Sequence, residues 1–173
     1  MPDAPDISAQ TILCFDFGTG QIGVAVGQTV AASARGLSVL KARDGQPNWA
    51  QVTALVEQWR PDQLLVGLPL NMDGTESEFC RRCRKFARRL SARTGLKVTM
   101  VDERLSTASA KSERFQSEEV IGGKRQKRSS QSSVRSGSRS GASDNYRDNP
   151  VDAEAAALIL QTWLYNPACG LEP

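Results

Sequence analysis

The chain has 173 residues, of which 39% are hydrophobic, so it is long enough to bury the core of one domain. It contains no histidine, which excludes Ser-His-Asp and Cys-His nucleophilic catalysis, His-mediated proton transfer and zinc sites that need imidazole. The net charge is only +3, but the basic residues are clustered, which indicates local contact with a polyanion. Any catalysis must therefore use carboxylates, Lys, Arg or Cys.

The cellular compartment is predicted from the cysteines and the apolar segments. The four cysteines show no regular spacing, which is typical of a reducing compartment. Residues 1–10 lack the basic start and apolar run of a signal peptide, and no apolar stretch approaches the roughly 20 residues that span a bilayer. We therefore expect a soluble cytoplasmic protein without a membrane partner.

The first patterned stretch is the apolar run at residues 12–15, which predicts a buried strand that ends at Asp16. Gly18 and Gly20 then supply turn residues, and the apolar run at 22–26 predicts the second strand of an antiparallel hairpin. Asp16 is a candidate site residue at this strand end; alternatively, it is a turn carboxylate bonded to its own backbone. The same D-F-G-T pattern also fits the phosphate-binding hairpin of a sugar kinase or an actin-like ATPase.

The next elements lead to a polar loop. Residues 34–40 predict a third strand, and a helix should follow from about Asn48. The apolar run at 64–68 lacks polar alternation, which predicts a parallel strand buried on both faces. Open α/β sheets usually bind ligands at the loops after such strands, so Asn71 and Asp73 are candidate substrate contacts, although both are also ordinary turn formers.

A second helix is predicted from a capping box formed by Thr75 and Glu78. Its apolar stripe consists of Phe79, Cys83, Phe86 and Leu90. The opposite face is strongly basic and lacks acidic residues after Glu78, so it is either a solvated surface or one whose self-repulsion is neutralised by phosphates. The residues of this face assigned to nucleic-acid binding are Arg81, Arg84, Lys85 and Arg88.

The strand predicted at residues 97–101 delivers two adjacent carboxylates, Asp102 and Glu103. Successive strand residues face opposite sides, so only one of the two can point toward a site that contains Asp16. We favour Glu103, with Asp102 as a close second. A helix is expected from Arg104 to about residue 115.

The composition changes abruptly at residues 116–149, which are rich in Ser, Arg and Gly. Such a segment cannot bury enough apolar surface to fold alone, so it is predicted to be a mobile basic loop. A flexible insertion without function is the alternative interpretation. The cluster suited to gripping a phosphate backbone is Lys124, Arg125, Lys127 and Arg128.

A last helix is predicted from Pro150, and Asp152 lies in its first turn, where the helix dipole alone favours a carboxylate. The apolar stripe of this helix is expected to be Val151, Ala155, Leu158, Ile159 and Trp163. The single domain is expected to cover residues 11–165, between a flexible tail at 1–10 and a C-terminal tail at 166–173.

Three acids from distant parts of the chain thus lie at element ends: Asp16, Glu103 (or Asp102) and Asp152. Their convergence would make a metal site, because Mg²⁺ and Mn²⁺ prefer oxygen ligands. Two such ions about 4 Å apart can activate a water and stabilise the leaving oxygen of a phosphodiester without histidine. The sequence pattern alone does not establish that the acids converge.

Four motifs occur in a fixed order: FDFGTGQIGVAVG, LLVGLPLNMDGTE, VDERLST and VDAEAAALILQ. Over roughly residues 11–115 and 150–165 the chain resembles the YqgF (RuvX) family of RNase H-like nucleases, which is related to the RuvC Holliday-junction resolvases. The resemblance implies an α/β fold with a mixed sheet, an antiparallel hairpin followed by parallel strands, flanked by helices. It also implies metal ligation by Asp16, by Asp102 or Glu103, and by Asp152.

Members of that family are associated with maturing the 5′ end of the small-subunit ribosomal RNA precursor, and some are described as junction resolvases. The expected function is therefore a Mg²⁺- or Mn²⁺-dependent endonuclease on structured RNA, with the ribosomal RNA precursor or the ribosome as partner. The alternatives are a Holliday junction resolvase that cuts branched DNA as a homodimer, and a non-catalytic RNA-binding assembly factor. An actin-like ATPase would need a second phosphate hairpin and a Gly-rich adenosine loop, and the sequence shows neither.

The chain departs from the family's pattern just before the last motif. A Ser/Arg-rich segment followed by RDNP stands where related chains have a shorter loop. We expect this insertion to alter the grip on substrate and to displace Asp152, while leaving the fold intact.

Overall fold

The computed structural model describes residues 9–105 and 150–173. Within them the strands form one seven-stranded sheet in the order β4-β3-β2-β1-β5-β6-β7. The strands are β1 (Thr11–Asp16), β2 (Gln21–Gln28), β3 (Ser33–Arg43), β4 (Gln46–Pro47), β5 (Gln63–Leu68), β6 (Val98–Asp102) and β7 (Gly170–Leu171). β1 pairs antiparallel with β2 and parallel with β5, so the predicted mixed sheet with an initial hairpin is confirmed.

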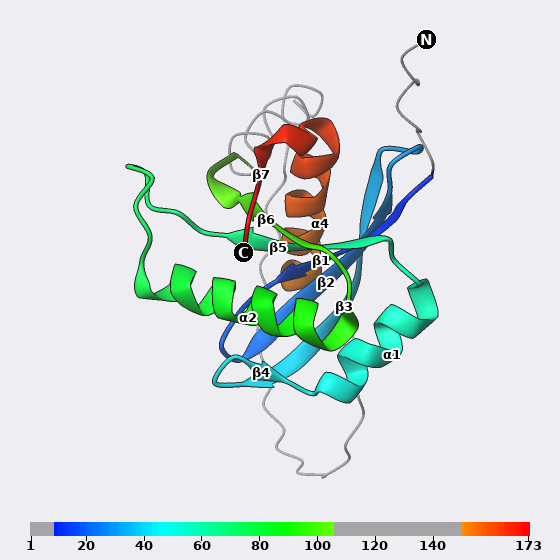
Figure 1. The fold of residues 1–173 in the computed structure, drawn as a ribbon, viewed down its shortest axis with the longest axis horizontal. Coiled ribbons are helices and arrows are strands. Elements are labelled where there is room, and N and C mark those ends of the chain that lie inside the picture. The colour runs from blue at the N-terminus through cyan, green and yellow to red at the C-terminus, as the bar shows by residue number, and fades with distance from the viewer. Residues whose placement is uncertain (1–8, 106–149) are drawn as a thin grey trace, which may run out of the picture.

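Helices cover both faces of this sheet. They are α1 (Trp49–Trp59), α2 (Glu78–Thr94) and α4 (Pro150–Tyr165), with a short 3₁₀ turn, η2, at Pro167–Cys169. α1 and α2 lie on one face and α4 on the other, as Figure 1 shows. β5 is therefore covered from both sides, which explains its uninterrupted apolar sequence. In the described parts of the chain, no helix is long and apolar enough to cross a membrane.

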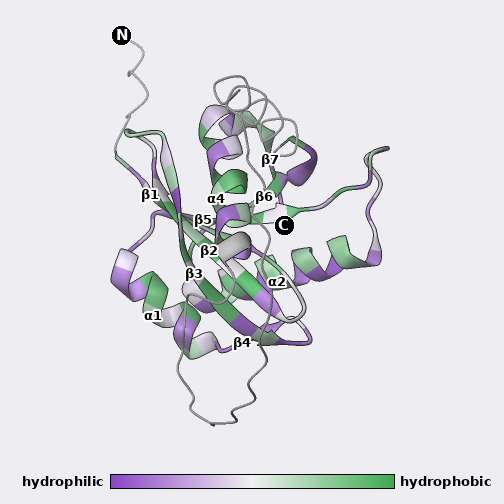
Figure 2. Cartoon of the chain, turned by 180° about the vertical axis from the view of Figure 1, so that it is seen from behind, coloured by the Kyte–Doolittle hydropathy of each residue, from purple (hydrophilic) through white to green (hydrophobic). Residues whose placement is uncertain are grey.

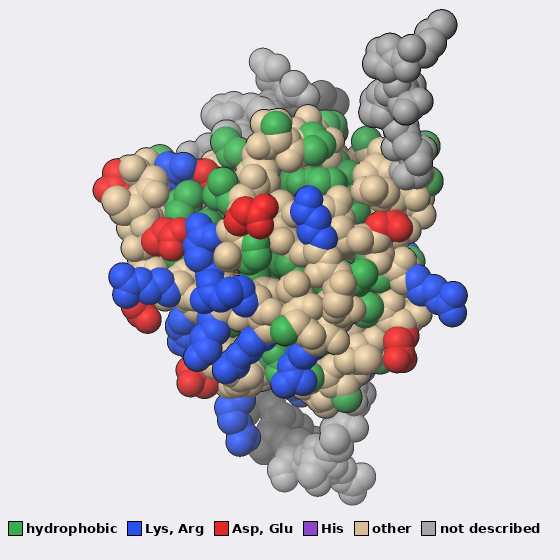
Figure 3. Space-filling model, viewed as in Figure 1, with side chains coloured by type: hydrophobic (Ala, Val, Ile, Leu, Met, Phe, Trp, Pro, Cys, Tyr) green, Lys and Arg blue, Asp and Glu red, His purple; other side chains and the backbone are tan. Residues whose placement is uncertain are grey.

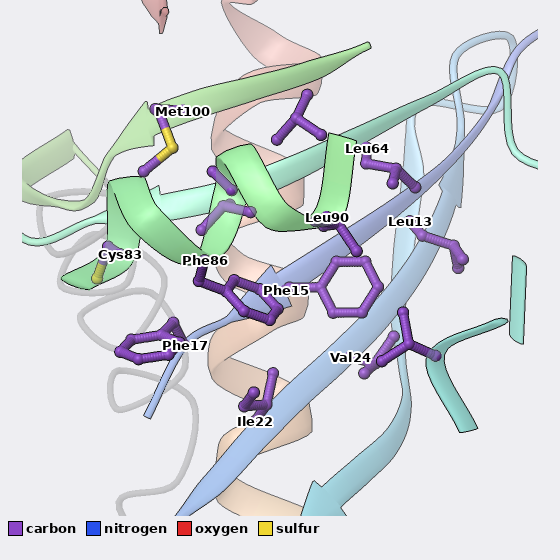
Figure 4. Close-up of a cluster of buried hydrophobic side chains, with 14 of the residues drawn as sticks. Leu13, Phe15, Phe17, Ile22, Val24, Leu64, Cys83, Phe86, Leu90 and Met100 are labelled. Atoms are coloured by element: carbon purple, nitrogen blue, oxygen red, sulfur yellow. The ribbon is translucent and has the colours of Figure 1, made fainter. Parts of the chain in front are cut away.

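Alternate residues of β1 divide the core into two layers. Leu13, Phe15 and Phe17 point to the side of α1 and α2, where Phe86 of α2 meets them (Figure 4). The ring centroid of Phe86 lies 6.0 Å from that of Phe15, 5.3 Å from that of Phe17 and 5.8 Å from that of Trp49. These aromatic contacts fix α2 on the sheet at the end of β1.

The opposite layer is built by α4 and by the other residues of β1. Cys14 of β1 packs there with Ala156 and Leu160 of α4. α4 approaches the sheet closely because Gly23 of β2 and Gly36 of β3 carry no side chain beneath its first turn. A Cβ atom on either glycine would collide with the backbone or side chain of residues at the start of α4.

The start of α2 differs from the predicted capping box. Ser77 is the N-cap, and its side chain accepts a hydrogen bond from the backbone N–H of Cys80. Thr75 instead donates its hydroxyl to Asp73 at 2.6 Å, so it belongs to the preceding loop and cannot cap the helix. The helix ends at Gly95, whose φ of 71° lies in the left-handed region that favours glycine. Figure 2 shows the alternating polar and apolar faces of α2.

The predicted apolar stripe of α4 is wrong at two positions. Leu158 is 38% exposed and Ala155 is only half-buried. Ala153 and Ala156 are buried in their place, together with the correctly assigned Ile159 and Trp163. The reason is the close approach of α4 to the sheet, which small residues permit and which a pattern weighted toward large apolar side chains misses.

The C-terminal residues are not a tail. Leu171 pairs with Met100, so β7 extends the sheet beyond β6, and the backbone carbonyl of Glu172 accepts a hydrogen bond from Arg84. A two-residue strand is too short to show an alternating pattern, which is why the sequence did not reveal it. The predicted loop at 116–149 and most of the helix predicted from Arg104 lie outside the described residues.

The cysteines are all free. Cys80 and Cys83 are buried on the inner face of α2, so both side chains fill the interface between this helix and the sheet.

Candidate active site

The direction of Asp16 follows from the pleat of β1. Phe15 and Phe17 point toward α2, whereas Cys14 points toward α4. Asp16 shares the face of Cys14, so its carboxylate lies at the end of β1 on the side of α4. Burial raises the pKa of the Cys14 thiol, and the charges of Asp16 and Glu103 add to this shift, so both acids lie near this residue.

The same alternation along β6 separates the two adjacent acids. Met100 packs into the layer of α2 and Val101 into the layer of α4. Asp102, the last residue of β6, therefore continues on the side of α2, and Glu103 turns to the side of Asp16. The structure thus confirms the preference for Glu103 as the residue that faces Asp16.

Asp102 is engaged by Arg104. The guanidinium of Arg104 donates from Nη2 to Asp102 Oδ2 at 2.7 Å and from Nε to both carboxylate oxygens at 3.1 Å. The backbone N–H of Arg104 also donates to Asp102 Oδ1 at 3.0 Å, so Asp102 caps the helical turn at residues 103–105. These bonds hold the pKa of Asp102 below its usual value. Asp102 thus has a structural partner on the side away from Asp16.

Glu103 is held in a partly buried position over β5. A Cβ atom on Gly67 would meet Glu103 Oε1 and the end of the Ile159 side chain, so the glycine leaves room for this carboxylate in its observed position. Burial raises the pKa of Glu103 to about 7, with further contributions from the charges of Asp16 and Asp102. Glu103 is therefore a carboxyl group that is costly to ionise in the absence of a cation.

Asp16 lies between Glu103 and Asp152. Burial raises the pKa of Asp16 to about 6, and repulsion from Asp152 adds to this shift. Asp152 stands in the first turn of α4, where its backbone lies directly on Gly23 of β2. The fold therefore brings all three predicted acids to one end of the sheet. The displacement of Asp152 by the inserted segment stays a prediction.

The donor set fits a hard divalent cation in its chemistry. Three carboxylates supply oxygen ligands. The pKa values of Asp16 and Glu103 are raised by burial and by repulsion between negative charges, and a bound cation would offset both effects. Across residues 9–105 and 150–173, however, no group of three or more His, Cys, Asp or Glu side chains is arranged to hold a metal ion as it stands. Mutual repulsion keeps carboxylates apart in a cation-free state, so ligation would require these side chains to close together.

The loop after β5 is organised by its own hydrogen bonds. Asp73 accepts from the backbone N–H of Thr75 at 3.0 Å, and the Asn71 side chain donates to Thr75 Oγ1 at 3.0 Å. Arg104 reaches across to the backbone carbonyl of Met72 at 3.3 Å and so ties the loop to the end of β6. Asn71 and Asp73 thus act as turn formers here, and their contact with substrate stays a prediction.

The basic face of α2 has acidic partners that come from other elements. Arg82 pairs with Asp44 at 2.7 Å, and Arg84 donates from Nε to Glu76 Oε1 at 2.8 Å. The sequence could not show these pairs because the acids lie outside the helix. Lys and Arg side chains nevertheless crowd this surface in Figure 3. The assignment of Arg81, Arg84, Lys85 and Arg88 to nucleic acid stays a prediction, and Lys124, Arg125, Lys127 and Arg128 lie outside the described residues.

Three residues that shape the site were missed in the sequence: Gly23, Gly67 and Arg104. The two glycines interrupt apolar strands, and glycine inside a strand often marks a close approach of another group. That signal was available. The sequence contained no comparable signal for Arg104, because the role of this residue depends on the distance between the end of β6 and the loop after β5.

Comparisons with known proteins agree with this geometry. Residues 10–134 match the RuvX family, described as "Holliday junction resolvase". A Pseudomonas fluorescens (strain Pf0-1) protein named "Putative pre-16S rRNA nuclease" is 51% identical over 158 residues, covering 91% of this chain and 94% of that protein. A Pseudomonas putida protein of the same name is 50% identical over 153 residues, covering 88% of this chain and 93% of its own.

A solved structure shares the fold. RuvC of Thermus thermophilus, in complex with a Holliday junction substrate, aligns with a TM-score of 0.51 and 16% identity, covering 94% of this chain and 99% of that one. At this identity the likeness concerns the fold, which is RNase H-like. The family match and the half-identical relatives go further, and they show that this chain belongs to the RuvX family of nucleases.

Proposed function

We propose that this protein is a cytoplasmic, metal-dependent endonuclease that hydrolyses phosphodiester bonds of structured RNA, and that it processes the 5′ end of the 16S ribosomal RNA precursor. The observation that carries the proposal is the meeting of Asp16, Glu103 and Asp152 at one end of the sheet. The choice of RNA rests on the relatives, which are named for pre-16S rRNA.

The three carboxylates would hold Mg²⁺ or Mn²⁺, as one ion or as a pair. A divalent cation supplies Lewis acidity for the attack of water on a phosphodiester. Asp16 and Glu103 bind protons more tightly than ordinary carboxyl groups, so loading the site would release protons near neutral pH. Arg104 withholds Asp102 from this set by occupying both of its oxygens.

The second candidate is a Holliday junction resolvase, because the matched family carries that description. Such an enzyme would act as a homodimer and cut four-way DNA symmetrically. A third candidate is a non-catalytic RNA-binding assembly factor, for which the three acids would be dispensable.

The deciding experiment compares two substrates with the purified full-length protein. One is a pre-16S rRNA leader and the other is a four-way DNA junction, each incubated with Mg²⁺, with Mn²⁺ and with EDTA. We expect metal-dependent cutting of the RNA that disappears in Asp16→Asn. Symmetric cutting of the junction alone would favour the resolvase. Binding of RNA without cleavage of either substrate would contradict both nuclease functions and favour the assembly factor.

Calorimetry of Mn²⁺ binding gives a second readout that does not depend on cleavage. Wild-type protein should bind the ion with release of protons, and Asp16→Asn should lose most of the affinity. Equal affinity in the two proteins would place the cation elsewhere.

A further inference from the structure

A cavity of about 540 Å³ lies on the face of the sheet opposite the three carboxylates. One wall is the outer face of α2 and the other is the hairpin between β3 and β4. Its floor is formed by the aromatic side chains Phe17, Trp49 and Phe86. The site of Asp16, Glu103 and Asp152 does not include this cavity, so its chemistry requires a separate explanation.

The hairpin wall is fixed by its backbone. Asp44 and Gly45 both have positive φ angles, 50° and 74°, in a two-residue turn that suits the sequence Asp-Gly. Gly45 donates its backbone N–H to the carbonyl of Thr19 at 2.9 Å, and a Cβ atom at Gly45 would contact Phe17. The cavity is thus anchored to the turn that directly follows Asp16.

The charges in the cavity do not cancel. Glu78 pairs with Arg81 at 3.2 Å, and Asp44 pairs with Arg82 at 2.7 Å. The remaining charged residues of the lining are Lys85 and Arg89, and neither forms an ion pair within residues 9–105 and 150–173. The cavity therefore presents two uncompensated positive charges above an apolar floor, an arrangement suited to an anion.

The spacing of these charges suits a chain of anions. Arg81, Lys85 and Arg89 succeed one another at four-residue intervals on one line of the helix, so neighbouring members are about 6 Å apart along its axis. That separation is comparable to the distance between neighbouring phosphates of a nucleic-acid strand. The basic surface over α2 in Figure 3 continues this line beyond the cavity.

The size of the cavity limits what can enter. Its volume lies within the roughly 300–1,000 Å³ of sites that enclose one small-molecule-sized group, so it accommodates a nucleotide unit of a strand but not a base-paired duplex. The Trp49 ring already contacts Phe86 and the guanidinium of Arg93, whose Cζ lies 4.5 Å from the ring centroid. Beside this apolar floor, Gln46 is the uncharged polar side chain of the lining, so binding should depend on the phosphates and on stacking more than on the identity of the base.

From these observations we propose that the cavity between α2 and the β3–β4 hairpin binds the backbone of single-stranded nucleic acid, with Lys85 and Arg89 as its phosphate contacts. The strand would then pass over the turn at Gly18–Gly20 toward the carboxylates on the other face. This assignment rests on the proposed nuclease function, because the cavity would hold the unpaired flank of a substrate whose scissile bond lies at Asp16.

The test is a binding titration with the cleavage-deficient Asp16→Asn protein in EDTA. The probes are fluorescent oligouridylate RNA, oligothymidylate DNA and a duplex of the same length. Lys85→Ala/Arg89→Ala is compared with the matched control Arg60→Ala/Lys97→Ala, which removes two exposed positive charges outside the cavity. All four residues lie on the surface or at its margin, so melting temperatures should agree among the variants.

We expect the cavity variant to bind single strands at least tenfold more weakly, whereas the control changes less than about threefold. The slope of log affinity against log salt should fall by about 0.7 for each lost contact. A loss with oligouridylate alone assigns the cavity to RNA, a loss with oligothymidylate alone assigns it to DNA, and either supports the proposal. Equal losses in the two variants, or a duplex bound as tightly as the single strands, would overturn it.

The two proposals fail separately. Because the titration needs neither cation nor cleavage, a protein that cuts nothing but loses single-strand binding in the cavity variant would retain the cavity assignment and lose the nuclease function. In the active protein, Lys85→Ala/Arg89→Ala should raise KM with little change in kcat, as expected for a contact made equally in the ground and transition states. A fall in kcat with unchanged KM would contradict the assignment.

Discussion

Gly23 of β2 lies directly against the backbone carbonyl of Asp152 at the start of α4. The contact joins the second strand of the chain to a residue more than a hundred positions later, and it fixes the depth at which the third carboxylate enters the site. Gly36 repeats the arrangement one strand further out, beneath Ala153.

Replacement of Gly23 by alanine should therefore damage the site. The new Cβ would collide with the Asp152 carbonyl, and α4 would have to move away from the sheet. We expect a loss of about 1–3 kcal/mol in the free energy of unfolding and at least a tenfold loss of cleavage. Gly20→Ala is the matched control, since nothing lies within 4 Å of a Cβ there. Unchanged activity and melting temperature in Gly23→Ala would disprove the positioning role.

Glu103→Gln and Asp102→Asn should have different effects. Glu103 faces Asp16, so its replacement should lower cleavage and Mn²⁺ affinity more than about 100-fold while leaving the fold intact. Asp102 is bonded to Arg104, so its replacement should mainly lower stability. Parallel cleavage assays and urea unfolding curves separate the two outcomes. If Asp102→Asn abolished metal binding while Glu103→Gln retained it, the assignment would be reversed.

The metal-free protein should lose stability as the pH rises from about 4 to about 7. Asp16 and Glu103 have folded pKa values of about 6 and about 7, above their ordinary values of 3.8 and 4.5. The folded state binds more protons than the unfolded state in this interval, so the free energy of unfolding decreases with increasing pH. Urea unfolding in EDTA across this range measures the slope.

Asp16→Asn should remove part of that slope. At neutral pH we expect the metal-free variant to be more stable than the wild type, by on the order of 1–3 kcal/mol, because a buried charge has been removed. Glu57→Gln, at an exposed position of α1, serves as the control and should leave the slope unchanged. A metal-free Asp16→Asn protein that is less stable at neutral pH would show that the Asp16 carboxylate is favourably paired.

Arg104→Gln should destabilise the end of β6 and the loop after β5. The Arg104 guanidinium holds the pKa of Asp102 below its usual value, so this pair stabilises the fold at neutral pH, and its contribution disappears as the pH falls through the folded pKa of Asp102. We expect a lower free energy of unfolding at neutral pH and faster proteolysis near Met72, which is 90% exposed.

A double-mutant cycle with Asp102→Asn tests whether Arg104 acts through that carboxylate. The effects of the two replacements on the free energy of unfolding should be less than additive. Full additivity would show that Arg104 stabilises the loop independently of Asp102.

The local chemistry of the chain was readable from the sequence. The apolar run before Asp16 and the uninterrupted run of β5 each predicted a strand that the structure confirms. The pleat of a strand was enough to predict that only one of Asp102 and Glu103 faces Asp16, because that rule depends on adjacent residues alone.

Failures arose where a role depends on distant partners. Thr75 has the spacing of a helix cap, but its hydroxyl bonds to Asp73. The helix face around Arg84 looked uncompensated because Glu76 and the Glu172 carbonyl approach it only in the folded chain. Two-residue strands such as β7 are too short to show the alternation of polar and apolar residues by which strands are predicted.

The sequence by itself determined the order of strands and helices, the three acids and the clustering of basic residues, since each is encoded in short segments whose periodicity and composition are local. The RNase H-like fold was implied by the resemblance that the four motifs carry. The tertiary structure decided which acid joins Asp16, how closely α4 approaches the sheet and where uncompensated positive charge remains. Those features depend on steric fit at Gly23 and Gly67 and on ion pairs between separate elements, and such contacts exist only after the chain has folded.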